Sequence, residues 1–182
     1  MTTYTTLNKI LKCNPCGRKT NGDSGFSKLL KHLNKTEADD EPLSFITILE
    51  SNGILDAKWC LRTLPDYDLK VMEFKLKCAR RVEHLDGSGA AKACLDVLAG
   101  FIDGNATKDE LRDAATAAAD ANADANAAAA YAATAAAYAD AADAAAYAAA
   151  NADADATDAD ATDAATDAER EYQTQIFREI FG

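Results

Sequence analysis

Hydrophobic residues in the first hundred positions recur at spacings of three and four, the pattern of amphipathic helices. Polar segments rich in Gly, Pro, Asn and Asp separate these patterns. We therefore expect short helices over residues 7–11, 26–33, 42–52, 56–64, 69–82 and 90–101. The stretch 45–49 also suits a short strand by propensity, but nothing nearby offers a second strand, so a helix is favoured there. Trp59 is expected to be buried.

A further helix is predicted to begin at Thr107, because Thr107-Lys-Asp-Glu110 has the form of a capping box. No Gly or Pro follows until Gly182. From residue 114 to residue 149, alanine recurs at alternate spacings of four and three, which is a heptad seam built from Ala alone. A methyl group buries too little area for an ordinary core. Such a seam can, however, let a second helix approach closely.

The alanine seam fails at Asp153, so we expect the helical pattern to break near residues 150–155. Helices over 107–150 and 154–181 would then pack as an antiparallel pair with their Ala faces in contact. The end of the chain is expected to dock on the N-terminal helices through Tyr172, Ile176, Phe177, Ile180 and Phe181. A five-residue period within 152–163 leaves a DNA-mimicking β-helix as an alternative.

These patterns predict an all-α fold, in which an N-terminal bundle of short helices precedes a long alanine-rich helical hairpin. The expected domains are a helical head over residues 1–105 and an acidic, alanine-rich helical region over 106–182. The second region ends in the apolar docking segment. Between residues 114 and 168, 34 of the 55 residues are alanine.

The charge is divided unequally between these two halves. The net charge is −11 overall, yet residues 1–112 carry 17 cations and 16 acids, a net charge of +1. Residues 113–182 carry two Arg and 14 acids, a net charge of −12. Direct binding of nucleic acid is therefore not expected, because phosphate contacts need Lys and Arg. A cationic protein surface is the expected partner, and the Ala seam also allows an oligomer.

Targeting signals and cysteine usage favour a cytoplasmic protein. No apolar run approaches the roughly 18 residues of a membrane span. The N-terminus lacks a basic region followed by an apolar stretch, so no secretory signal is expected. The five cysteines are an odd number and three fall within helical patterns, which suits a reducing compartment.

The motif Cys13-x-x-Cys16 is the one pair of residues with metal-ligand or redox spacing. A structural zinc would need two further ligands, and no second paired spacing supplies them. A thioredoxin-like site would need an α/β pattern that is absent. We favour a tight turn with a buried thiol, and expect no cofactor and no metal. His84 lacks an identifiable nucleophile or orienting acid.

The candidate residues for partner binding lie in the alanine-rich tract. Tyr131 and Tyr138 are seven residues apart and flank the Ala seam on one face, where they could anchor a partner. They could equally be the bulky residues that pack between two Ala helices. The acidic candidates are Asp140, Asp143, Asp153 and Asp158. We find no catalytic constellation.

Besides the Ala tract, a series of short segments runs through the chain in order: Pro15-Cys16-Gly17, Lys35-Thr36, Asp39-Asp40-Glu41-Pro42-Leu43-Ser44, Ile48-Leu49-Glu50-Ser51-Asn52-Gly53, Asp56-Ala-Lys-Trp59-Cys-Leu-Arg62, Cys78-Ala-Arg-Arg81, Gly104-Asn-Ala-Thr107 and Glu169-Arg-Glu171. Through these segments the chain resembles a family of phage and bacterial immunity proteins with an alanine-rich helical C-terminal half. The resemblance implies an all-helical head, an Ala-rich tail and an immunity function. Many members have Trp and Arg in the tract where this chain has Tyr, Asp and Asn.

The sequence thus favours a non-enzymatic binding protein that neutralises a toxin or a host-defence component by protein–protein contact. Two alternatives remain open. The acidic rod could imitate DNA and inhibit a nucleic-acid-binding enzyme, or the chain could be a structural or assembly protein of a phage.

Overall fold

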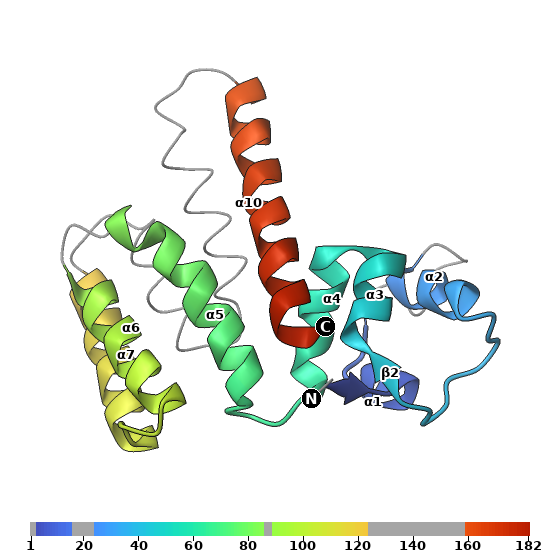
Figure 1. Ribbon diagram of the computed structural model, residues 1–182, viewed down its shortest axis with the longest axis horizontal. Helices are drawn as coiled ribbons and strands as arrows, with labels where there is room; N and C mark the ends of the chain where they lie inside the picture. Colours follow the sequence, from blue (N-terminus) through green and yellow to red (C-terminus); the bar gives the residue numbers. More distant parts are fainter. Residues whose placement is uncertain (1–2, 16–23, 86–88, 124–158) are drawn as a thin grey trace. The chain divides into compact units, whose positions relative to one another are not determined.

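The structure is a computed structural model that describes residues 3–15, 24–85, 89–123 and 159–182 (Figure 1). The fold is mostly helical, as the sequence predicts, with one small two-stranded sheet. Its residues form two compact units. The first unit comprises Met1–Asp68 together with Phe177–Gly182, and the second comprises Leu69–Ile176. The composition, in contrast, changes near residue 105.

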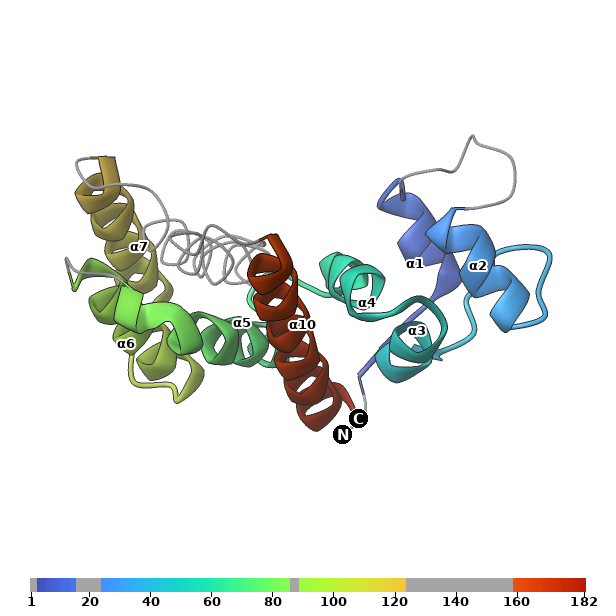
Figure 2. The ribbon, with the colours of Figure 1, turned by 90° about the horizontal axis from the view of Figure 1, so that it is seen from above.

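The first unit is built from short elements. They are β1 (Tyr4–Thr5), α1 (Leu7–Lys12), α2 (Gly25–His32), β2 (Leu43–Ser44), α3 (Phe45–Asn52), α4 (Ile54–Cys60), the 3-10 helix η1 (Leu61–Thr63) and the last turns of α10 (Ala159–Phe181). Helix α3 packs against both α2 and α4, and the three lie side by side in both ribbon views (Figures 1 and 2).

Hydroxyl side chains set the starts of three of these helices. Thr6 accepts a hydrogen bond from the backbone N–H of Lys9 at 3.1 Å, which caps α1. Ser24 and Ser44 cap α2 and α3 in the same way. Gly53, with φ of +90°, ends α3 and precedes α4, so the expected stop at 52–53 is confirmed. Few other residue types adopt that backbone conformation.

The small sheet corrects one sequence-based expectation. Residues 45–49 are helical as predicted, but the two residues before them form β2. The strand β2 pairs antiparallel with β1, with Tyr4 opposite Ser44 and Thr5 opposite Leu43. The N-terminal segment therefore supplies the second strand that the sequence did not reveal.

Three phenylalanine rings hold the end of α10 in the first unit. Phe45 of α3 lies 6.5 Å from Phe177 and 5.6 Å from Phe181, between ring centroids. Phe177 and Phe181 lie 4.6 Å apart, and all three rings are fully buried. The predicted docking of the C-terminal segment on the N-terminal helices is confirmed for these two residues.

The second unit consists of α5 (Leu69–Val82), the 3-10 helix η2 (Glu83–Leu85), α6 (Ala90–Ile102), α7 (Lys108–Ala123) and the part of α10 that precedes Phe177. Helix α6 packs against both α5 and α7 (Figure 2). One core cluster is aliphatic and contains Met72, Ala79, Leu95, Leu98 and Leu111. A second cluster contains only small side chains, namely Ala91, Cys94, Ala115 and Ala118.

The capping box at the start of α7 forms as predicted. The backbone N–H of Glu110 donates to the hydroxyl of Thr107 at 3.2 Å. The carboxylate of Glu110 in turn accepts from the backbone N–H of Thr107 at 2.7 Å. Two of the backbone donors that the helix start leaves without a partner are thereby satisfied.

The start of the alanine seam packs against α6. Ala118 is fully buried, Ala115 is buried and Ala114 is half-buried, and all three contact the cluster that includes Ala91 and Cys94. The buried face thus also takes in Ala115, one residue beside the predicted seam. Helices α7 and α10 fall within the predicted spans 107–150 and 154–181. The predicted break at 150–155 lies outside the described residues.

Candidate functional site

The partner-binding residues predicted from the sequence lie outside the described residues. Tyr131, Tyr138, Asp140, Asp143, Asp153 and Asp158 all fall within 124–158. The described part of the chain supplies the framework on both sides of that tract.

The cysteine motif is described in part. Cys13 follows α1, is half-buried, and its thiol donates to the carbonyl oxygen of Arg62 at a sulfur–oxygen distance of 4.0 Å. Cys16 lies outside the described residues. Within the described residues, no three His, Cys, Asp or Glu side chains are grouped so that they could hold a metal ion.

The remaining described cysteines are buried thiols. Cys60, Cys78 and Cys94 are buried, and neither they nor Cys13 form a disulfide. Burial raises the pKa of Cys60 to about 12, and burial also raises the pKa of Cys94. Both side chains are therefore protonated near neutral pH and act as small apolar residues rather than as nucleophiles.

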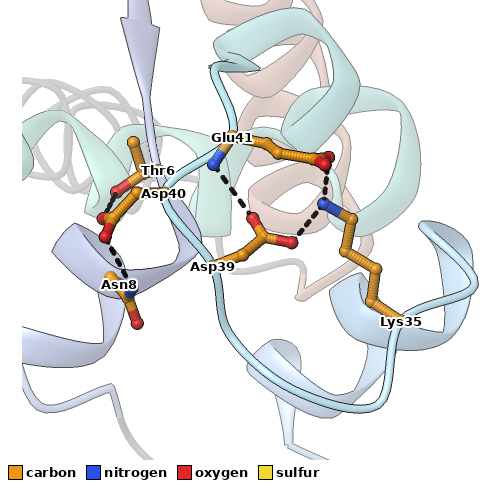
Figure 3. A network of polar contacts seen from close by, with 6 residues as sticks. All are labelled: Thr6, Asn8, Lys35, Asp39, Asp40 and Glu41. Carbon is orange, nitrogen blue, oxygen red and sulfur yellow. Dashed lines mark hydrogen bonds and ion pairs between the residues drawn. The ribbon is translucent and has the colours of Figure 1, made fainter.

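A polar network holds the acidic loop that precedes β2 (Figure 3). The ammonium group of Lys35 pairs with Asp39 and, at 2.6 Å, with Glu41. Asp40 accepts hydrogen bonds from the side-chain amide of Asn8 at 3.0 Å and from the hydroxyl of Thr6 at 3.3 Å. Each of the three acids thus has a partner within the chain.

Electrostatics in this loop follow from those contacts. The hydrogen bond to Asp39, and then the one to Glu41, raise the pKa of Lys35. The same Lys35 hydrogen bond lowers the pKa of Asp39. Lys35 and Asp39 are therefore both charged near neutral pH, and these contacts brace the loop rather than form an acid–base pair poised for catalysis.

Arginine side chains organise the second unit in a similar way. Arg80 pairs with Glu83 and with Asp96, and Asp96 also accepts from Lys92 at 2.6 Å. The hydrogen bonds from Lys92 and then from Arg80 lower the pKa of Asp96. These ion pairs join α5, η2 and α6. His84 is exposed, and its Nδ1 donates to the carbonyl oxygen of Arg81 at 3.1 Å.

A cluster of polar side chains that the sequence did not predict joins α5 and α10. We call it the polar clasp, and it consists of Arg81, Glu169, Tyr172 and Gln173. Glu169 is 1% exposed and accepts from Arg81 Nε at 2.7 Å and from Gln173 Nε2 at 3.1 Å. The guanidinium of Arg81 also lies over the ring of Tyr172, 4.5 Å from its centroid. Burial is the main factor that raises the pKa of Tyr172.

Trp59 is less buried than the sequence predicts. The side chain is half-buried rather than buried. Its ring carries the guanidinium of Arg62, which lies 4.3 Å from the ring centroid. The only sequence signal is the i, i+3 spacing of the two residues, which places them on one helical face.

The acids of the head and those of the tract differ in their access to cations. In the head, cationic and acidic residues are nearly equal in number, and the pairs at Lys35 and Arg80 neutralise several of them. No Lys or Arg occurs between Arg112 and Arg170. No acid deep within that stretch therefore has a cation three or four residues away in the sequence, the spacing at which ion pairs form along a helix.

Comparison of the chain with protein families, with curated proteins and with solved structures gave no match. None of the described helices combines the length and the hydropathy needed to cross a bilayer.

Proposed function

We propose that this chain is a non-enzymatic binding protein of the immunity type, which neutralises a toxin or a host-defence component by protein–protein contact. It would act in the cytoplasm of a bacterium or of a phage-infected cell. The observation that carries the proposal is the charge division. A head whose charges balance is followed by residues 113–182 with a net charge of −12.

The proposed contact surface is the acidic, alanine-rich tract. A helical hairpin over 107–150 and 154–181 would present the acids along a face with very small side chains. Asp140, Asp143, Asp153 and Asp158 would attract a cationic partner, and Tyr131 and Tyr138 would anchor it. Acidic surfaces of this kind raise association rates by steering the encounter.

The experiment begins with capture of a partner from bacterial lysate by the immobilised full chain. The captured protein is then purified and titrated at two salt concentrations. The variant Asp140→Asn/Asp143→Asn/Asp153→Asn/Asp158→Asn should associate more slowly, and its deficit should shrink at high salt because exposed charges are screened.

The matched control removes four acids outside the tract, through Glu37→Gln, Glu50→Gln, Asp66→Asn and Asp103→Asn, all exposed in the structure. It changes the net charge equally and should bind like wild type. If neither salt nor the four tract substitutions changes the association rate, the tract is not the contact surface. Competition by duplex DNA would favour the DNA-mimic function. A chain that captures only itself would favour a structural or assembly role.

A further inference from the structure

Three residues spaced four and three apart form a stripe along α4 and η1, in which Leu55 and Arg62 are exposed and Trp59 is half-buried. Leu55 is 52% exposed, Trp59 follows one turn later, and Arg62 is exposed three residues beyond it. Helix α4 turns its other side to the core through Ile54, Ala57 and Cys60. From Leu55 to Arg62 the stripe extends about 10 Å along the helix axis. The stripe consists of Leu55, Trp59 and Arg62.

The guanidinium of Arg62 is held in place on this stripe. Its Nε donates to the carbonyl oxygen of Trp59 at 2.9 Å, and its planar group lies on the indole ring. Stacking on an aromatic face is a favourable contact for an arginine. The side chain is thus ordered before any partner arrives, which lowers the entropic cost of binding.

Hydrogen bonds from other elements also hold the backbone of η1 around Arg62. The hydroxyl of Thr63 donates to the carbonyl oxygen of Cys60 at 2.8 Å, and Thr5 of β1 donates to Thr63 at 2.6 Å. The thiol of Cys13 donates to the carbonyl oxygen of Arg62. Contacts from β1 and from the end of α1 therefore support η1 on its inner side.

Arg62 is an ordered guanidinium without a carboxylate partner in the part of the chain that the structure describes. Arg80, Arg81, Arg112 and Arg170 each form an ion pair with a carboxylate. Arg62 and Arg178 are exposed and form no ion pair within the described residues, and of these two it is Arg62 whose guanidinium is hydrogen-bonded and stacked on an aromatic ring. A planar, ordered guanidinium that lacks a carboxylate matches the bidentate geometry of a carboxylate from another molecule.

We propose that the stripe of Leu55, Trp59 and Arg62 is a docking surface for a protein segment in which a carboxylate lies beside an apolar side chain. The carboxylate pairs with Arg62, while the apolar side chain covers Leu55 and the edge of Trp59. Trp and Arg are the residue types that most often dominate protein interfaces. The proposal does not depend on the acidic tract.

The same chemistry argues for a protein segment over nucleic acid. A single arginine on a chain of net charge −11 gives little attraction for a phosphate backbone. An exposed leucine beside it gains from an apolar partner, which a phosphate backbone does not offer. The small size of the stripe implies a weak, transient complex.

The test uses the full chain and starts from a random dodecapeptide display library. The library is first depleted on the Leu55→Ser/Arg62→Gln variant and then selected on wild type. Peptides that carry Asp or Glu next to Leu, Ile, Phe or Met are expected. Trp59 is the only tryptophan of the chain, so its fluorescence reports binding of the synthetic peptide at the stripe.

Matched variants distinguish binding at this surface from nonspecific binding to exposed apolar side chains. Arg62→Gln should weaken peptide binding about tenfold, as expected for a lost charge-assisted hydrogen bond, and Leu55→Ser should also weaken it. Leu69→Ser is the control, because Leu69 is likewise 52% exposed but lies in α5. It should leave the affinity unchanged. Unchanged melting temperatures show that the three variants are folded.

Four outcomes would overturn the proposal. The selection could yield no peptide that prefers wild type to the depletion variant, or peptides that lack an acidic residue. Leu69→Ser could weaken binding as much as Leu55→Ser does. A dT12 oligonucleotide could shift the Trp59 emission in a manner that Arg62→Gln abolishes, which would make the stripe a nucleic-acid contact instead.

Discussion

Two helix contacts in this chain are built from opposite kinds of side chain. In the first unit, α3 meets the end of α10 through Phe45, Phe177 and Phe181. In the second unit, α7 contributes Leu111 to the aliphatic cluster, but further along the helix it meets α6 through the cluster of small side chains, to which it contributes Ala115 and Ala118. Both contacts are buried, yet one is made of large rings and the other of small side chains.

The two contacts should respond differently to a change in side-chain size. An aromatic ring buries about 150–250 Å² of surface, so its stabilisation comes from area. A methyl group buries little, and its value is that it allows two helix backbones to approach each other. The aromatic contact should therefore be sensitive to truncation, whereas the alanine contact should be sensitive to enlargement.

The largest effect should come from removing a ring from the aromatic contact. Phe177→Ala should lower the free energy of unfolding by about 3–5 kcal/mol, the usual range for a buried aromatic residue. Urea denaturation followed by circular dichroism measures it. Tyr4→Ala, at an aromatic residue that is half exposed, is the control and should cost far less. Equal losses would show that the three rings do not form the core of this contact.

The polar clasp of the second unit should show an asymmetry between its partners. Arg81→Met leaves Glu169 buried without its cation, and should cost about 3 kcal/mol or slightly more. Glu169→Gln removes the buried charge but keeps an oxygen that accepts hydrogen bonds, so it should cost only about 1 kcal/mol. The Arg81 side chain is 45% exposed and can be solvated.

The double variant tests the reason for that asymmetry. Arg81→Met/Glu169→Gln should recover much of the stability that Arg81→Met loses, because no buried charge remains. The readout is again the free energy of unfolding in urea. The double variant could instead lose as much free energy of unfolding as the two single variants lose together. In that case, the loss in Arg81→Met comes from the packing of the arginine stem.

Periodicity and capping residues made most described helices predictable from the sequence. The spacing of apolar residues is a local property, and the hydroxyl of Thr107 caps a helix within the same four residues. The docking of Phe177 and Phe181 was also predictable, because a strongly apolar end needs a core to cover it.

Non-local contacts were not predictable in the same way. The pairing of β1 with β2 joins residues about 40 positions apart, and neither two-residue strand has a periodicity to detect. The pair of Arg81 and Glu169 spans 88 positions. Trp59 was expected to be buried because it is large and apolar, but an indole can also be covered by a neighbouring guanidinium. The predicted partner-binding residues of the tract stay predictions.

Enlarging an alanine should damage the second contact although it adds apolar surface. Ala118→Leu places a larger side chain in the cluster with Ala91 and Cys94, and overpacking of this kind costs about 1–3 kcal/mol. Ala117→Leu is the control, since Ala117 is exposed on the same helix. Thermal unfolding of the two variants compares them directly. A higher melting temperature for Ala118→Leu would mean that the helices are loosely packed there.

The smallest effect should appear at the start of α7, the helix that carries the alanine contact. The hydrogen bond from the backbone N–H of Thr107 is the main cause that lowers the pKa of Glu110 below its ordinary value of 4.5. A carboxyl whose pKa is lower in the folded state stabilises the fold above its unfolded pKa. That contribution is lost as the pH falls through the folded pKa.

Glu110→Gln isolates this contribution, because glutamine can still complete the capping box but does not titrate. The difference in unfolding free energy between wild type and Glu110→Gln should be constant from neutral pH down to about pH 5. It should then decrease as the pH falls below 4.5. Other carboxyls with lowered pKa values, such as Asp39 and Asp96, titrate equally in both proteins and cancel. A difference that stays constant at every pH would show that Glu110 caps α7 without a preference for its charged form.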